Sequence, residues 1–275
     1  MNNLNLENEL LRVEITPDLG GRIDSIIYIP TNKNWVWKNS QIENKPVSKY
    51  SNYDDNWQGG WEELFPNDAI EEFEWGKGLD HGELWSAPWN VDFVSDNEVN
   101  LSTETLDSGT VFRKIIKIRD NALKVSYKAH IKFNDNFLFK LHLAVPLDSS
   151  TEVICDSQNI EKVYDDFGNI INKGKDFFNL KKDSGNFDFA YIDLKTNEIL
   201  VKDSVNNSMK LNFGDENLRY FWIFQTQGGW RNHNVLVLEP ASNSKKHLVD
   251  SIKDNKALKG PLDFNCHYEV EFRNE

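Results

Sequence analysis

The chain has 275 residues, of which 39% are hydrophobic and 27% are charged, a balance typical of globular proteins. Its formal charge of -13 repels nucleic-acid phosphates and anionic membrane surfaces, so we expect neither as a partner. The N-terminal residues show no basic stretch followed by an apolar run, and no segment approaches the roughly 18 apolar residues of a membrane span. These features lead us to expect a cytoplasmic protein.

The chain lacks the sequence motifs that mark several common kinds of chemistry. Cys155 and Cys266 stand far apart without C-x-x-C spacing, which predicts two free thiols and neither a disulfide framework nor a structural zinc site. Gly-x-Gly-x-x-Gly, Walker, Gly-x-Ser-x-Gly and His-Glu-x-x-His sequences do not occur. We therefore expect a protein that needs no cofactor and no metal.

Short segments with period-two alternation recur along the chain and predict strands with one buried face. They cover residues 10–15, 91–94, 111–118, 123–129, 210–213 and 267–272. Turn-forming Asp, Asn and Gly separate them, for example at 18–21, 119–121 and 166–169. The segment 62–65 is the best candidate for a short helix or turn. Since no linker divides the sequence, we expect residues 1–275 to form one all-β domain.

The segment 57–68 combines paired glycines, two tryptophans and three acidic residues. Indole faces pack against the C–H faces of a pyranose ring, while carboxylates and amides accept hydrogen bonds from hydroxyl groups. This combination suits a neutral sugar. A packed aromatic corner with no binding role is the alternative.

A second irregular segment, residues 80–89, places His81 beside Gly82 and near two tryptophans. Such a partly apolar setting can hold one imidazole tautomer and tune its proton affinity. The alternative is a histidine with a purely structural role.

The third segment, residues 234–241, is an apolar strand that ends in Glu239. A carboxylate there is costly unless it is paired or used, and burial would raise its pKa towards the working range of a general base. Backbone N–H groups could instead satisfy it. His142 is flanked by apolar strand-like residues, which predicts burial but no particular role.

Taken together and in this order, several segments resemble the aldose 1-epimerase family, the galactose mutarotase-like proteins. The resemblance is carried by residues 17–23, 59–66, 81–82, 88–89, 142 and 238–240. It implies a large antiparallel β-supersandwich. It also implies interconversion of the α and β anomers of a free aldose by ring opening, rotation about C1–C2 and reclosure.

The resemblance also implies roles for single residues. Glu239 would be the base, His142 the acid, and His81 would bind and polarise the ring oxygen or an adjacent hydroxyl. Further sugar contacts would come from Arg22, Asn67 and Asp68, with a stacking face from Trp85. Many relatives follow the His-Gly pair with an aromatic residue and an arginine, whereas Glu83 and Trp85 stand here, so the identity of the sugar stays open.

Three other functions compete with this interpretation. A sugar-phosphate mutarotase of the same fold would need several basic groups around a dianion, which the acidic composition disfavours. A noncatalytic carbohydrate-binding or sugar-sensing protein could keep the same aromatic cleft. A glycosidase could pair Glu63 with Glu239, and the separation of the two carboxyl groups would set its stereochemical outcome.

Overall fold

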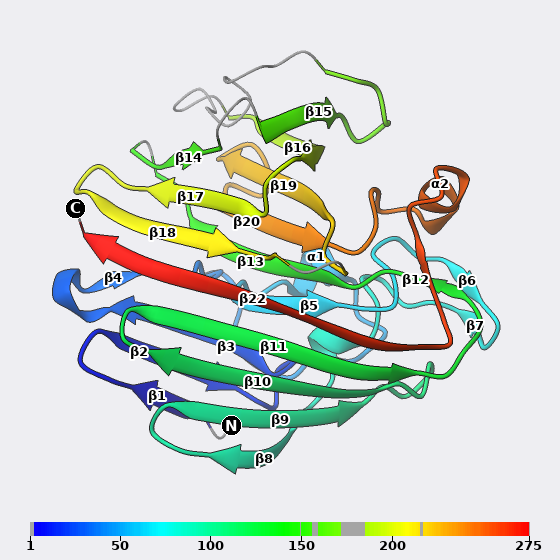
Figure 1. Cartoon of the computed structure of the whole chain (residues 1–275), viewed down its shortest axis with the longest axis horizontal. Coiled ribbons are helices and arrows are strands. Elements are labelled where there is room, and N and C mark those ends of the chain that lie inside the picture. The colour runs from blue at the N-terminus through cyan, green and yellow to red at the C-terminus, as the bar shows by residue number, and fades with distance from the viewer. Residues whose placement is uncertain (1–2, 149, 156–158, 172–184, 215–216, 275) are drawn as a thin grey trace.

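The computed structural model describes residues 3–148, 150–155, 159–171, 185–214 and 217–274. These residues form two large antiparallel sheets that lie face to face, so that one stands in front of the other in Figure 1. Among them, no helix is long and apolar enough to cross a membrane.

The first sheet has ten strands in the order β1-β2-β3-β5-β13-β20-β19-β16-β15, with β4 paired to β3. In that order the strands are β1 Leu4–Glu7, β2 Leu11–Thr16, β3 Arg22–Tyr28, β5 Trp61–Leu64, β13 Lys140–Pro146, β20 Asn234–Ala241, β19 Tyr220–Gln227, β16 Phe187–Leu194, β15 Ile160–Tyr164 and β4 Lys33–Asn34.

The second sheet has eight strands, β14 Glu152–Ile154, β17 Glu198–Lys202, β18 Asn207–Asn212, β22 Leu262–Asn274, β11 Ala122–Ile131, β10 Val111–Arg119, β9 Glu98–Glu104 and β8 Asn90–Val94, in that order. Two small two-stranded sheets flank them, β12 Asn136–Phe137 with β21 Leu258–Lys259 and β6 Glu72–Phe73 with β7 Gly76–Lys77. The helices are short: α1 Tyr53–Asn56, α2 Leu248–Lys253, and the 3-10 turns η1 Ile29–Thr31 and η2 Leu84–Ser86.

The main hydrophobic core fills the space between the two sheets. In β10, buried and more exposed residues alternate strictly, so Phe112 and Ile116 face the first sheet. Phe112 packs edge-on against Phe65, with ring centroids 4.9 Å apart, and lies over Phe139 of the facing sheet. Complete burial of each such ring contributes about 1.5–3 kcal/mol, so this aromatic layer is a main reason that the sheets stay together.

The all-β prediction is confirmed, and each of the six predicted strands overlaps an observed one. The prediction of a short helix or turn at residues 62–65 was wrong, because Trp61–Leu64 form strand β5 in the middle of the first sheet. All four residues of β5 are buried, since both faces of the sheet are covered there. The strand consequently lacks the polar-apolar alternation by which sequence analysis finds strands. That residues 1–275 form a single domain stays a prediction.

Candidate active site

The cleft lies on the outer face of the ten-stranded sheet, the face turned away from the second sheet. The register that pairs Lys140 with Ala241 and Leu143 with Leu238 places His142 across from Glu239. Glu62 of β5 is the partner of His142 on its other side. Because side chains on neighbouring strands that share a register position point to the same face, these three groups form one row across the sheet.

The cleft has a volume of about 340 Å³, and two kinds of side chain line it. The charged and polar ones are Asp54, Asp68, His81, Lys140, His142, Asp166, Glu239 and Lys246. The aromatic ones are Tyr53, Trp57, Phe187, Phe189, Phe224 and Trp230, of which Tyr53 stacks on His81 and Trp57 packs edge-on against His142. Flat apolar faces beside convergent hydrogen-bonding groups are suited to binding a sugar ring.

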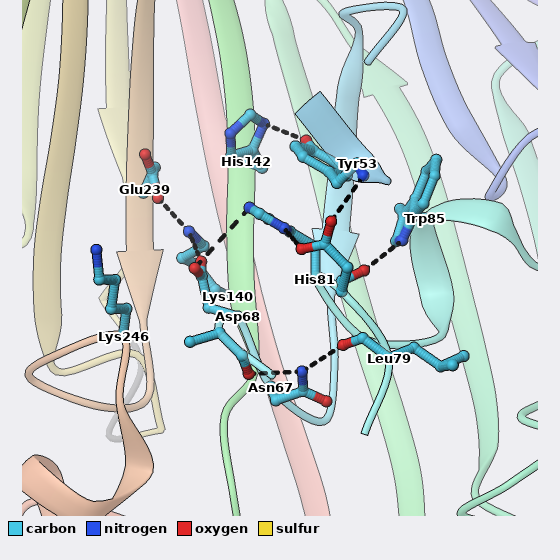
Figure 2. A network of polar contacts seen from close by, with 12 residues as sticks. Tyr53, Asn67, Asp68, Leu79, His81, Trp85, Lys140, His142, Glu239 and Lys246 are labelled. Carbon is cyan, nitrogen blue, oxygen red and sulfur yellow. Dashed lines mark hydrogen bonds and ion pairs between the residues drawn. The ribbon is translucent and has the colours of Figure 1, made fainter. Parts of the chain in front are cut away.

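His81 stands on a constrained loop at the wall of the cleft (Figure 2). Its backbone has a φ of 58°, an uncommon conformation for a non-glycine residue that often marks a functional position. Its Nδ1 lies 2.8 Å from the carboxylate of Asp80, which also accepts the backbone N–H of Tyr53. The Tyr53 ring stacks on the imidazole at 3.9 Å between centroids. These contacts fix the ring and turn Nε2 towards the cleft, where Asp68 lies 3.9 Å away.

The ammonium group of Lys140 donates hydrogen bonds to both Asp68 and Glu239, the latter at 2.5 Å (Figure 2). Burial alone would lower the pKa of Lys140, but the two carboxylates outweigh it and raise the pKa, so the amine stays charged. Burial would raise the pKa of Asp68, but Lys140 and His81 hold it at about 2. Burial raises the pKa of Glu239, and the opposing effect of Lys140 offsets this rise only in part. Of the two carboxyl groups that share one ammonium, Glu239 is therefore the one able to take up a proton.

The row across the sheet continues from Glu239 to His142 and then to Glu62. His142 Nδ1 lies 3.2 Å from the hydroxyl oxygen of Tyr53, and that hydroxyl donates to Glu62 at 2.5 Å. Burial, with the nearby positive charges of Lys140 and His81, holds the pKa of His142 well below its usual value. Burial raises the pKa of Glu62 to about 7, although Arg22 opposes this. His142 is thus a neutral imidazole at pH 7, and Glu62 titrates near that pH.

Of the residues proposed from the sequence, the structure brings His81, His142, Glu239 and Asp68 together in this cleft. The other three lie behind its lining. Arg22 forms an ion pair with Asp24 at 2.6 Å and belongs to a separate small cavity.

Asn67 and Trp85 support the loops that form the cleft wall. Asn67 donates its amide hydrogens to the backbone oxygens of Leu79, at 2.6 Å, and of Ala69. Trp85 is buried, donates its indole N–H to the Asp80 carbonyl, and packs edge-on against Tyr53 at 5.1 Å between centroids. These contacts suit Asn67 and Trp85 to holding His81 and Tyr53 in place. Arg22, Asn67 and Trp85 do not line the cleft.

Several cleft residues were missed by the sequence analysis. Lys140 had a recognisable signal, because it stands two residues before His142 in a predicted strand and therefore shares its face. Tyr53 had none, since it begins the single-turn helix α1 within a polar loop. Phe187, Phe189 and Phe224 are ordinary strand aromatics in sequence, and only the sheet order brings them to this cleft.

Glu63 lies on the opposite face of β5 from Glu62. It accepts hydrogen bonds from Lys114, at 2.6 Å, and from the Tyr127 hydroxyl, both on the second sheet. It does not line the cleft, so a glycosidase pair of Glu63 and Glu239 has no structural support. Cys155 and Cys266 are not joined by a disulfide bond. Within the described residues, no group of three or more His, Cys, Asp or Glu side chains is arranged to hold a metal ion.

Comparisons by sequence find no matching family model and no matching curated protein. Solved structures do match over nearly their whole length. The Slr1438 protein of Synechocystis sp. PCC 6803 has a TM-score of 0.77 at 13% identity, covering 100% of this chain and 96% of that one. A galactose mutarotase related enzyme from Lactobacillus acidophilus has a TM-score of 0.71 at 15% identity, covering 99% and 97%. A galactose mutarotase-like protein from Lactobacillus casei ATCC 334 has a TM-score of 0.72 at 12% identity, covering 99% and 100%.

At these identities the matches establish the fold alone. The chain has the galactose mutarotase-like β-sandwich fold, which confirms the fold expected from the sequence resemblance.

Proposed function

We propose that this protein is an aldose 1-epimerase, which interconverts the α and β anomers of a free aldose. The observation that carries the proposal is the cross-strand placement of His142 beside Glu239 in a cleft that His81 also lines. Ring opening needs a base that takes the anomeric hydroxyl proton and an acid that protonates the ring oxygen. Two proton-carrying groups side by side on one sheet face can serve both needs.

Each polar residue has a role that follows from its surroundings. Lys140 occupies one carboxylate oxygen of Glu239, which leaves the other oxygen free to accept the anomeric proton. His142 would donate a proton to the ring oxygen, and the two residues would exchange roles when the ring closes on the opposite face of C1. His81, oriented by Asp80, would donate a hydrogen bond from Nε2 to the ring oxygen or to a neighbouring hydroxyl.

The charges of the cleft favour a neutral sugar over a sugar phosphate. Its lining holds four carboxyl groups, Asp54, Asp68, Asp166 and Glu239, against two lysines and His81. Lys140 is already engaged by two carboxylates, and Lys246 lies 2.8 Å from Asp166. A phosphate dianion would have to displace these partners to obtain comparable contacts.

The variant Glu239→Gln tests the proposal. An amide cannot take up the anomeric proton, so we expect anomer exchange to slow by roughly 10²–10⁴-fold while the fold is retained. Exchange is measured by saturation-transfer NMR over a panel of free and phosphorylated aldoses, and folding by circular dichroism.

Glu83→Gln is the matched control, because Glu83 is also a buried carboxyl group and accepts hydrogen bonds from the backbone N–H groups of Asp107 and Ser108 outside the cleft. It should retain exchange. A wild-type protein that binds aldoses without accelerating their exchange would instead be a carbohydrate-binding protein. Acceleration of phosphorylated aldoses alone would indicate a sugar-phosphate mutarotase.

A further inference from the structure

The proposed role of His142 raises a problem of charge. An imidazole that takes up or releases a proton at one nitrogen usually passes through a charged state. Burial and the nearby cations Lys140 and His81 hold the pKa of His142 far below its usual value, so the imidazolium is strongly disfavoured here. His142 can therefore move protons only if it gains one at one ring nitrogen as it loses one at the other.

The structure supplies a partner for such an exchange. The Tyr53 hydroxyl bridges Nδ1 of His142, at 3.2 Å, and the carboxyl group of Glu62, at 2.5 Å. The direct distance from Nδ1 to the carboxyl oxygen is 3.8 Å, so the hydroxyl is the shorter route. In Figure 2 the other nitrogen of the imidazole lies on the side facing Glu239. Tyr53 and Glu62 are both buried, which excludes bulk water from the chain of hydrogen bonds.

We propose that Glu62 and Tyr53 form a buried proton relay that switches the tautomer of His142, so that Nε2 can present either a proton or a lone pair to the substrate. The use of this relay in catalysis rests on the proposed function. The change of tautomer itself takes place in the protein without substrate.

The relay moves protons without separating charge across His142. When Nε2 gives its proton to the ring oxygen, Nδ1 takes the proton of the Tyr53 hydroxyl, and the tyrosine oxygen takes the proton of the Glu62 carboxyl group. The net change is that Glu62 becomes a carboxylate and the substrate oxygen gains one proton. The reverse sequence returns the proton when the ring closes. Glu62 and Glu239 thus hold one exchangeable proton between them.

Charged groups surround Glu62 from every neighbouring element. Those that act on Glu62 itself are Arg22 on β3, Lys38 after β4, Glu63 on β5 and His81 on its loop. Asp24 pairs with Arg22 and Lys38, and Asp68 and Glu239 act on the Tyr53 hydroxyl that bonds Glu62 and pair with Lys140 of β13. Because these charges are of both signs, their effects on Glu62 partly cancel. Burial is the largest influence, and it raises the pKa of Glu62 to about 7. The relay therefore changes state within an accessible pH range.

The tautomer of His142 can be read directly by two-bond ¹H–¹⁵N NMR on protein labelled at the histidine nitrogens, with the signal assigned from His142→Gln. At pH 5.5, about 1.5 pH units below the pKa, we expect Nε2–H; at pH 8.5 we expect Nδ1–H and a bare Nε2, with no imidazolium signal at either pH. In Glu62→Gln and Tyr53→Phe the tautomer should no longer change with pH. A wild-type tautomer that is the same at both pH values, or a switch that survives in Tyr53→Phe, would overturn the relay.

Activity gives a second readout. Tyr53→Phe should slow anomer exchange by roughly 10²-fold or more while sugar binding, followed by ligand-observed NMR, persists. Tyr127→Phe is the matched control, because Tyr127 makes the same kind of buried tyrosine–glutamate hydrogen bond on the far face of β5 and should keep the wild-type rate. Equal loss in both variants would contradict the relay.

The two proposals fail in different ways. If the wild-type protein exchanges no aldose but the tautomer still switches with pH, the proposed function is wrong and the relay stands. If exchange occurs with a fixed tautomer, the relay is wrong and the function stands. The wild-type titration uses His142→Gln only to assign the signal, so it decides the matter even if Tyr53→Phe does not fold.

Discussion

Asp68 and Glu62 are two buried carboxyl groups of the cleft region, and their partners determine which of them carries a charge. Asp68 is held at a pKa of about 2 by Lys140 and His81. Glu62 is also fully buried, but its hydrogen-bond partner is the neutral Tyr53 hydroxyl, and burial raises its pKa to about 7. Similar burial therefore gives opposite results, because Lys140 and His81 outweigh the loss of water at Asp68, whereas Arg22 and His81 only partly offset it at Glu62.

The raised pKa of Glu62 predicts a pH-dependent stability. The folded protein holds this proton more tightly than the unfolded chain, so the stabilisation is fully present below pH 4.5 and is lost as the pH rises to about 7. The difference between 4.5 and about 7 corresponds to roughly 3 kcal/mol. In Glu62→Gln, urea unfolding across pH 4.5–8 should show a correspondingly smaller fall in the free energy of unfolding.

Glu43→Gln is the control for this titration, because Glu43 is largely exposed and forms its ion pair with Lys45, its neighbour in a surface loop. Its pH profile should match that of the wild type. A Glu62→Gln profile that also matches would show that Glu62 does not carry the raised pKa.

At the scale of single elements, the loop that carries His81 depends on a close backbone approach. Gly82 has a φ of 76°, and a Cβ there would lie 2.2 Å from the backbone oxygen of Phe65. Glu83 donates its backbone N–H to that same oxygen. The loop is thus fastened to the end of β5, and the placement of His81 against Tyr53 follows from that attachment.

The stability lost in Gly82→Ala, compared with that lost in Gly109→Ala, measures how tightly the loop is held against Phe65. Both glycines have positive φ, but a Cβ at Gly109 meets nothing within 4 Å. We expect Gly109→Ala to cost about 1–2 kcal/mol from backbone strain alone, and Gly82→Ala a further 1–3 kcal/mol from the collision, by thermal or urea unfolding. Equal losses would mean that the loop can move aside without cost.

At the scale of the whole molecule, the cleft and the second sheet are linked through the shared core. Phe112 of the second sheet packs against Phe65 and Phe139, which follow β5 and precede β13. The strands that carry Glu62 and His142 are therefore held in place from the far side of the first sheet. The single-domain prediction can be tested through this link.

Phe112→Ala should remove about 3–5 kcal/mol of stability. If residues 1–275 are one domain, tryptophan fluorescence, which reports on the cleft among other sites, and far-UV circular dichroism should shift together to one lower unfolding midpoint. Two separate transitions would indicate that the sheets unfold independently.

The strand content and the fold were predictable because half-buried strands such as β10 and β11 show polar-apolar alternation over their whole length. The central strand β5 could not be predicted in this way, because burial on both faces removes that alternation. For the site, His81 and Glu239 stood out as polar groups in unusual local settings, whereas His142 was proposed mainly from the family resemblance. The resemblance also proposed Arg22, Asn67 and Trp85, yet these three do not line the cleft.

The sequence by itself determined that the segments with polar-apolar alternation became strands and, through the family resemblance, that the fold would be an antiparallel β-sandwich. Only the tertiary structure decided that His142 lies across from Glu239, and that Tyr53, 89 positions away in sequence, bridges His142 and Glu62. The physical reason is that local pattern sets backbone conformation, whereas proton affinity depends on burial and on charges supplied by other strands. Lys140, Tyr53 and Glu62 acquire their chemistry from neighbours that are remote in sequence.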